Sequence, residues 1–236
     1  MATFKFKQFT IRQERTAMKV GTDGVLLGAW VNLNFNPQSI LDIGTGTGLI
    51  ALQMAQRCGA ETLDAIELEP QAFEEAVDNF EQSDWGDRLY CYHSSLQDFA
   101  EEIDDTYDLI ISNPPFFERD NQIVNKERSL ARQNTTLSYS DLLKCSVKLL
   151  SEKGSCAFII PFSEEQEFLA LSLENNLYSQ RITRVKGHKT ALLKRSLLQL
   201  SFTKTQPKID ELVVEKSRHN YTEDYIKLVK DFYLKM

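Results

Sequence analysis

The feature that most constrains the fold is a regular alternation, from about residue 38 onward, of short apolar runs and amphipathic segments. Short apolar runs predict buried β-strands, and apolar residues three or four positions apart predict helices. Strands are predicted at residues 39–43, 62–67, 88–93, 107–112, 155–160, 179–186 and 193–202. Helices are predicted at residues 49–57, 71–81, 96–102, 138–151 (with Ser140 as N-cap) and 164–175. This order predicts an α/β fold with a mostly parallel seven-stranded sheet, helices on both faces and an antiparallel strand near the C-terminus.

The composition is that of a globular protein with one substantial core. The chain has 236 residues, of which 42% are hydrophobic and 26% charged. Because it has no repeat and no Gly/Ser-rich linker, we expect a single domain over residues 1–236 with an N-terminal extension, residues 1–37. No apolar run reaches membrane-spanning length, and the N-terminus has no signal-peptide core. The four cysteines lack CxxC spacing, so we expect neither a metal site nor disulfides, and a reduced cytoplasmic setting. We also expect a monomer.

A net charge of −7 is unusual for a protein that binds nucleic acid, but the charges are unevenly distributed. Between residues 181 and 208 there are eight Lys or Arg residues and no acidic residue. The first 20 residues carry five basic side chains against one acidic side chain. Such segregation predicts a positive face for a polyanion, because the local field matters more than the net charge. The alternative is a set of solvated charges scattered around the surface.

Three glycines, Gly44, Gly46 and Gly48, follow Asp42 where the first predicted strand joins the first predicted helix. Glycine permits the backbone of a tight turn and lets a ligand approach the main chain closely. A dinucleotide fingerprint would need glycine at position 49, which is Leu49, so a nicotinamide oxidoreductase is disfavoured. The spacing instead resembles motif I of the class I S-adenosylmethionine-dependent methyltransferases, which implies their Rossmann-like fold.

That resemblance implies that three carboxylates bind S-adenosylmethionine. Glu67, which closes the second strand, is expected to accept hydrogen bonds from both ribose hydroxyls. Asp98, after the third strand, is expected to accept from the adenine amine of the cofactor. Asp42 is expected to reach the methionine amino group, directly or through water. The alternative for Glu67 and Asp98 is a surface carboxylate.

The tetrapeptide Asn113-Pro114-Pro115-Phe116 follows the apolar strand at residues 107–112. The Asn113 side-chain oxygen and the Pro114 carbonyl can both accept hydrogen bonds from one amino group, and the prolines restrict the backbone that carries them. Two acceptors on one amine favour a pyramidal, nucleophilic nitrogen, and Phe116 offers a ring for stacking. We therefore predict that this tetrapeptide is catalytic, with Asn113 also beside the cofactor. The alternative is a strand-ending turn with a packed Phe.

Segments at both ends of the chain resemble one family of this class. Residues 6–11 and 18–30, the latter containing Met-Lys-Val-Gly-Thr-Asp-Gly, look like the N-terminal signature of the bacterial tRNA1(Val) (adenine-N6)-methyltransferases. Residues 221–234 are similar to the C-terminal helix of that family. The resemblance implies methylation of N6 of adenine 37, which lies immediately 3′ of the anticodon in tRNA(Val).

The resemblance also implies that Thr22 and Asp23 lie near the methionine end of the cofactor. Alternatively, Thr22 or Asp23 caps a helix that runs to Val31. The chain departs from the family at Arg132-Gln133, where members often carry Arg-His. A role for a histidine at that point is therefore not implied.

Such an enzyme would transfer the methyl group directly to adenine N6, without metal or covalent intermediate. The target base must leave its stack, and Phe116 or Phe117 would then stack on it. Residues 118–136 have the length of a loop that gates the substrate. Substrate-binding residues are predicted beside the tetrapeptide, in this loop and on the basic strands: Phe117, Arg119, Arg128, Arg132, Lys186, Lys189 and Arg195.

Other functions stay open, because the tetrapeptide is shared with DNA adenine, rRNA guanine and protein glutamine methyltransferases. A glutamine side chain also presents an NH2 group, which makes a protein glutamine methyltransferase the nearest alternative. DNA adenine is disfavoured, since nothing in the chain resembles a separate sequence-reading domain. A further alternative is a cofactor-binding module that binds RNA without catalysis.

Overall fold

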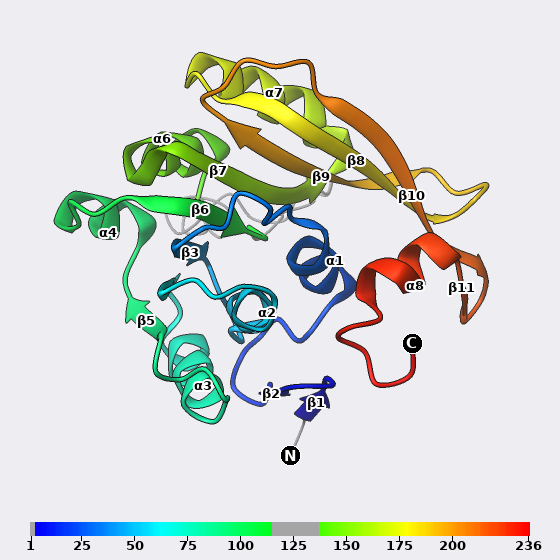
Figure 1. Ribbon diagram of the computed structural model, residues 1–236, viewed down its shortest axis with the longest axis horizontal. Coiled ribbons are helices and arrows are strands. Elements are labelled where there is room, and N and C mark those ends of the chain that lie inside the picture. The colour runs from blue at the N-terminus through cyan, green and yellow to red at the C-terminus, as the bar shows by residue number, and fades with distance from the viewer. Residues whose placement is uncertain (1–2, 115–136) are drawn as a thin grey trace, which may run out of the picture.

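The computed structural model describes residues 3–114 and 137–236, in which a nine-stranded sheet forms the centre of the molecule (Figure 1). Its strands are β3 (Ser39–Ile43), β4 (Thr62–Glu67), β5 (Leu89–His93), β6 (Tyr107–Ser112), β7 (Leu150–Pro161), β8 (Tyr178–His188), β9 (Leu193–Ser201), β10 (Lys208–Ser217) and β11 (Asn220–Tyr221). They are arranged in the order β11-β10-β8-β9-β7-β6-β3-β4-β5.

Most neighbouring strands are parallel, as predicted. β3 pairs in parallel with β4 and β6, β4 with β5, and β6 with β7. β9 runs antiparallel to both β7 and β8, which confirms the antiparallel strand near the C-terminus. The seven predicted strands are all present, from β8 to β5 in this order, and β10 and β11 extend the sheet beyond β8, where the sequence predicts no strand.

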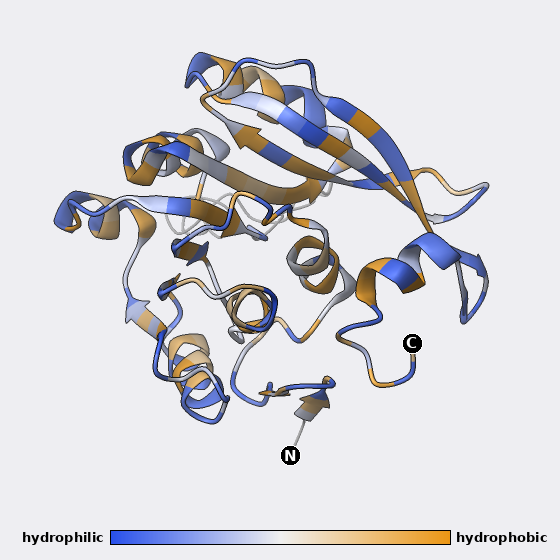
Figure 2. Cartoon of the chain, viewed as in Figure 1, coloured by the Kyte–Doolittle hydropathy of each residue, from blue (hydrophilic) through white to orange (hydrophobic). Residues whose placement is uncertain are grey.

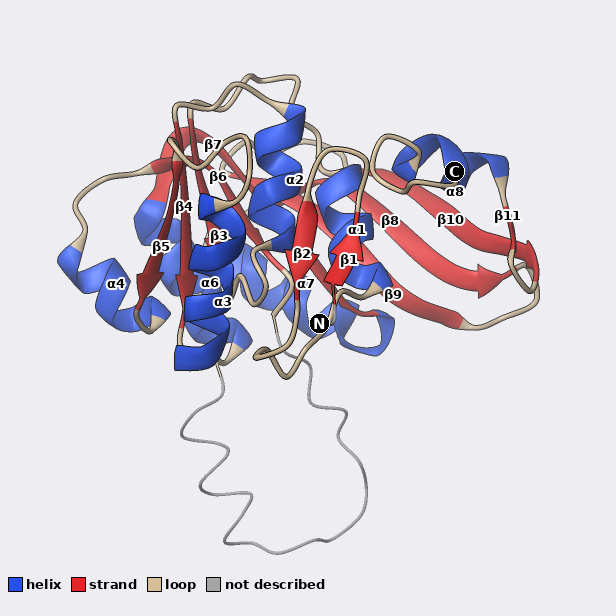
Figure 3. Cartoon of the chain, turned by 90° about the horizontal axis from the view of Figure 1, so that it is seen from below, coloured by secondary structure: helices blue, strands red, loops and turns tan. Residues whose placement is uncertain are grey.

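Helices cover both faces of the sheet (Figures 1 and 3). One core lies under α1 (Thr22–Trp30), α2 (Leu49–Arg57), α3 (Pro70–Glu81) and α8 (Glu223–Val229). The other lies under α4 (Leu96–Glu102), α6 (Tyr139–Leu149) and α7 (Glu165–Glu174), which the 3-10 helix η1 (Phe162–Glu164) precedes. Successive strand residues alternate between the cores, as Ile110 and Ile111 do. Nowhere in residues 3–114 and 137–236 is a helix long and apolar enough to cross a bilayer.

Hydrophobic residues dominate the central strands, whereas hydrophilic residues become frequent on β8 and β10 (Figure 2). In β10 only Leu212 is fully buried, and Lys208, Ile209 and Glu211 are exposed. A strand of this kind has no continuous apolar run, which is why the sequence did not predict it.

Both ends of the described chain pack into the core under α1. β1 (Thr3–Lys5) and β2 (Thr10–Arg12) form a small antiparallel hairpin, and the intervening Phe6 is buried. Phe6 also forms a β-bridge with Tyr233. α8 is shorter than the predicted residues 221–234, because the chain turns after Val229 and buries Phe232.

The predicted N-cap Ser140 is wrong, and so is the alternative in which Thr22 or Asp23 caps a helix. α6 begins after Ser138, whose hydroxyl accepts a backbone N–H of the first turn at 3.1 Å, whereas Ser140 lies inside the helix. α1 begins after Gly21 without a side-chain cap. Because Thr22 and Asp23 lie within the first turn of α1, neither caps it.

Candidate functional site

Several predicted site residues lie at or directly after the carboxyl ends of β3, β4 and β6, which point to the same edge of the sheet (Figure 3). β3 and β6 end on the same row of the sheet, and β4 continues one residue further, to Glu67. Gly44 and Asn113, directly after β3 and β6, therefore lie level with Glu67. The Ser112 hydroxyl donates to the Ile43 carbonyl at 2.7 Å and joins the two strand ends. The topology thus gathers residues that lie far apart in the sequence.

The glycine loop, residues 44–48, is a tight turn with open space beside its backbone. The φ angles of Gly44, Gly46 and Gly48 are 68°, 56° and 81°, a left-handed conformation that favours glycine. The N–H of Gly44 donates to the Ile66 carbonyl at 2.9 Å, which attaches the loop to β4. A Cβ atom at Gly44 or Gly46 would have no heavy atom within 4 Å. A ligand can therefore approach the loop closely there.

Asp42 is a buried carboxylate under this loop, with 1% of its surface exposed. Its Oδ2 accepts hydrogen bonds from the Thr45 hydroxyl at 2.6 Å and from the Ala51 N–H at 3.2 Å. Its Oδ1 is buried and has no hydrogen-bond partner among the described residues. Burial raises the pKa of Asp42 to about 7; the two hydrogen bonds oppose this rise, and the charge of Glu67 adds to it. A positively charged donor at Oδ1 would satisfy this atom.

Glu67 ends β4 and Asp98 follows the neighbouring β5, as predicted, but each already accepts hydrogen bonds. Glu67 accepts from the N–H groups of Gly46 and Glu69, both at 2.9 Å. Asp98 is exposed in the first turn of α4 and accepts from the hydroxyl of Ser95, the N-cap, at 2.6 Å. A carboxylate has about four acceptor positions. Both side chains therefore keep capacity for ligand hydroxyl or amino groups.

Asn113 presents a second buried acceptor at the same edge of the sheet. Its side-chain Oδ1 is buried and has no hydrogen-bond partner in the described part of the chain, and Pro114 after it is buried. A buried acceptor without a partner is unfavourable, and at this edge of the sheet, level with the open backbone of Gly44, a ligand donor would satisfy it. Several predicted residues lie outside the described residues, namely Pro115, Phe116, Phe117, Arg119, Arg128 and Arg132.

The segment before α1 reaches this edge as well. Thr22 is exposed at the start of α1, and the Asp23 carboxylate accepts from Arg195 Nε on β9 at 2.7 Å. Gly24 packs so closely on α2 that an added Cβ would lie 3.1 Å from Leu49. Asp23, predicted to bind cofactor, and Arg195, predicted to bind substrate, are therefore ion-paired with each other.

The basic strands differ from the predicted positive face, because acidic side chains of other elements pair with some of their cations. Arg184 on β8 donates to Glu165 through two nitrogens, the shorter contact being 2.7 Å. Lys186 lies 2.8 Å from Glu211 on β10. Without a predicted β10, the sequence could not reveal that pairing. Arg184 and Lys186, two of the cations along β8, are therefore already neutralised by carboxylates.

Free basic side chains remain at the ends of these strands. β8 and β10 run parallel to β7, so their carboxyl ends point to the same edge as Asn113. The turns after them face a common hollow lined by His188, Lys189, Thr190 and residues 215–218. Lys189, Lys194 and Arg218 are exposed, and none forms an ion pair with another described residue. The positive region is thus at the turns.

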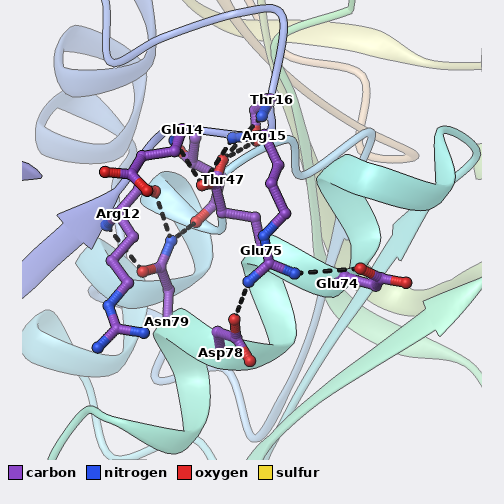
Figure 4. A network of polar contacts seen from close by, with 9 residues as sticks. All are labelled: Arg12, Glu14, Arg15, Thr16, Thr47, Glu74, Glu75, Asp78 and Asn79. Carbon is purple, nitrogen blue, oxygen red and sulfur yellow. Dashed lines mark hydrogen bonds and ion pairs between the residues drawn. The ribbon is translucent and has the colours of Figure 1, made fainter. Parts of the chain in front are cut away.

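The structure contains a buried polar network beside the glycine loop whose residues are not among the site residues predicted from the sequence. Glu75 and Asn79 of α3 bind the backbone of residues 12–16, and Asn79 also binds Thr47 (Figure 4). The sequence carries one signal of it. Positions 75 and 79 are four residues apart, on the side of α3 that also carries Ala72 and Ala76.

Comparison with known proteins gives a consistent result. Residues 21–161 match the family model "Methyltransferase small domain". A protein of Christiangramia forsetii named tRNA1(Val) (adenine(37)-N6)-methyltransferase is 54% identical over 99% of this chain and 98% of its own length. A protein of Flavobacterium psychrophilum with the same name is 53% identical over 99% of this chain and all of its own.

The fold also matches a solved structure. A "predicted O-methyltransferase" from Agrobacterium tumefaciens superposes with a TM-score of 0.68 at 17% identity, over 89% of this chain and 96% of that one. At this low identity the likeness concerns the fold.

Proposed function

We propose that this chain, which belongs to the tRNA1(Val) (adenine(37)-N6)-methyltransferase family, methylates N6 of adenine 37 in a tRNA(Val). The observation that carries the proposal is the buried Oδ1 of Asn113, which has no hydrogen-bond partner among the described residues and lies level with the glycine loop. It is the acceptor that an exocyclic amine requires at this position.

The residues at the sheet edge fit S-adenosylmethionine. The Oδ1 of Asp42, which has no partner among the described residues, suits the ammonium of the methionine moiety, and the open backbone at Gly44 and Gly46 would admit the ligand. Glu67 would accept from the ribose hydroxyls and Asp98 from the adenine amine. Thr22 and Asp23 would line the methionine end. When bound, this cofactor supplies an electrophilic methyl group on a sulfonium.

Asn113 and Pro114 would orient the attacking amine. The Asn113 oxygen accepts one N6 hydrogen and the Pro114 carbonyl the other, so the nitrogen lone pair is directed at the methyl group. Fixed acceptors in a site that excludes water contribute more than they would in water. Because nitrogen loses its proton only after it has become cationic, no side chain has to act as a strong base.

RNA would be held by cations at the ends of β8 and β10 and by an aromatic ring over the flipped base. Lys189, Lys194 and Arg218 form no ion pair with another described residue and would be available for phosphate contacts, whereas Lys186 and Arg195 would first have to exchange their carboxylate partners. Phe116 and Phe117 keep the stacking role that the sequence predicts. Unstacking an anticodon-loop base requires less free energy than unstacking one in a duplex.

The test is nucleoside mapping after methylation in vitro. Bulk tRNA from cells that lack the protein is incubated with the protein and S-adenosylmethionine, digested, and examined by mass spectrometry. We expect N6-methyladenosine at position 37 of tRNA(Val). Methylation at another nucleotide, or transfer into a glutamine of a ribosomal release factor with none into tRNA, would contradict the proposal.

A further inference from the structure

The N-terminal segment of residues 12–16 crosses α3 and is held there by one buried carboxylate (Figure 4). Glu75, 1% exposed, accepts the successive backbone N–H groups of Glu14, Arg15 and Thr16 at 2.5, 3.0 and 2.9 Å. It also accepts the hydroxyl of Thr16. Successive N–H groups that converge on one anion fix the backbone strongly. Although burial raises the pKa of Glu75, these hydrogen bonds outweigh it, and the pKa is lowered.

Asn79, one turn further along α3, joins the same segment to the glycine loop. It is 2% exposed, and its Oδ1 accepts the Arg12 N–H at 2.8 Å. Its Nδ2 donates to the Arg12 carbonyl at 3.0 Å and to the Thr47 carbonyl at 2.8 Å. Both hydrogens of the amide are therefore used. Aspartate has no donor to replace them.

The bond to Thr47 matters because it fixes the peptide group that precedes Gly48. Gly48 is the N-cap of α2 with φ of 81°, and an added Cβ there would lie 2.5 Å from the Phe80 ring. Asn79 and Phe80 together make α3 a rigid support behind the second half of the loop. The first half is held from β4, by the Ile66 carbonyl on Gly44.

We propose that Asn79 is a positioning residue for the cofactor site. By binding Arg12 and Thr47 at once, it holds the glycine loop in its binding conformation and couples that conformation to the N-terminal segment that leads to Thr22 and Asp23. This inference rests on the proposed use of S-adenosylmethionine.

The test measures binding of S-adenosylhomocysteine by calorimetry for the full chain and for Asn79→Ser and Asn79→Asp. The matched control is Asp78→Asn, the adjacent residue, which contacts Arg15 of the same segment from the exposed side of α3. Loss of a buried hydrogen bond in Asn79→Ser should raise the Kd about tenfold, which corresponds to about 1.4 kcal/mol. KM for S-adenosylmethionine should rise in parallel while kcat at saturation is unchanged. Asp78→Asn should bind as the wild type does.

Thermal unfolding of each variant separates positioning from general stability. A raised Kd for Asn79→Ser at temperatures well below its unfolding transition supports the proposal, whether or not Asn79→Asp folds. A lowered unfolding temperature with wild-type Kd and KM would overturn it and leave Asn79 a structural residue. If the wild type itself does not bind S-adenosylhomocysteine, the proposed function fails first.

Discussion

Two regions at the same edge of the sheet use polar residues in opposite ways. At the ends of β3 and β6, two buried oxygens, Asp42 Oδ1 and Asn113 Oδ1, have no partner among the described residues. Along β8, by contrast, Arg184 and Lys186 are paired with Glu165 and Glu211. The sequence suggests function in both regions. The two regions differ in their surroundings: the unsatisfied acceptors lie beside open backbone of the glycine loop that can admit a ligand, whereas Arg184 and Lys186 are already neutralised by carboxylates.

Replacing Asn113 by alanine should give the largest effect and tests the first region. Loss of one positioned acceptor should lower kcat about 100- to 1000-fold, by analogy with the loss of one oxyanion-hole donor. The Kd for S-adenosylhomocysteine should stay near the wild-type value, because Asp42, Glu67 and the glycine loop are unchanged. Transfer of labelled methyl groups to tRNA and calorimetry measure the two quantities. The exposed Asn34→Ala serves as control, and full activity of Asn113→Ala would remove Asn113 from the mechanism.

Replacing Glu165 by alanine tests whether the second region is structural. The change removes the buried acceptor of Arg184 and Ser196. Breaking a fully buried pair costs roughly 3–5 kcal/mol, but Arg184 is 33% exposed, so we expect about 2 kcal/mol in the free energy of unfolding. Urea denaturation measures this loss, and kcat of the folded variant should be unchanged. A lost kcat at full stability would instead assign Glu165 to the active site.

The pKa of Asp42 offers a further test of the first region, since the pKa of a carboxylate with an unsatisfied oxygen should change when a ligand binds to that oxygen. Its pKa is raised to about 7, and a cofactor ammonium at Oδ1 would favour the ionised form and lower that pKa. Binding then releases a proton, and affinity is full above pH 7 and falls below it. Between pH 8 and pH 6 we expect the Kd to rise about tenfold. Calorimetry in two buffers measures the released proton and the Kd. A wild-type Kd that does not change with pH, as in Asp42→Asn, would disprove the link between Asp42 and cofactor binding.

The prediction with the smallest expected effect compares Lys194, which has no ion-pair partner among the described residues, with the paired Lys186. Lys194→Ala should lower tRNA affinity a few-fold and reduce the slope of log K against log salt by about 1, because one phosphate contact is lost. Lys186→Ala should change both less, since Glu211 already neutralises this side chain at 2.8 Å. Filter binding at several salt concentrations measures the slopes. Equal effects of the two variants would show instead that the paired Lys186 contributes to the positive face as much as Lys194 does.

Much of the fold was predictable because it depends on local patterns. The buried strands β3, β4 and β6 are apolar runs, and the glycines between β3 and α2 have positive φ, as their residue type suggests. Asn113, Glu67 and Gly44 were predictable as a group, because carboxyl ends of parallel strands meet at one edge. Periodicity and residue type contain this information.

The features that were missed depend on contacts between distant segments. The Glu75 and Asn79 contacts join residues 61 and 67 positions apart, and the only local signal of them is their spacing on the side of α3 that carries Ala72 and Ala76. β10 lacks an apolar run, so its pairing with β8 and its neutralisation of Lys186 were not visible. Likewise, the alternative role of Thr22 or Asp23 as the cap of α1 rests on residue type alone, whereas Gly21 holds that position.

The most direct test of the account is a structure of the protein with S-adenosylhomocysteine and an anticodon stem-loop of tRNA(Val). We expect adenine 37 flipped out, with its N6 about 3 Å from both Asn113 Oδ1 and the Pro114 carbonyl oxygen. An N6 atom beyond hydrogen-bond distance of both oxygens, or a different base in the site, would contradict it.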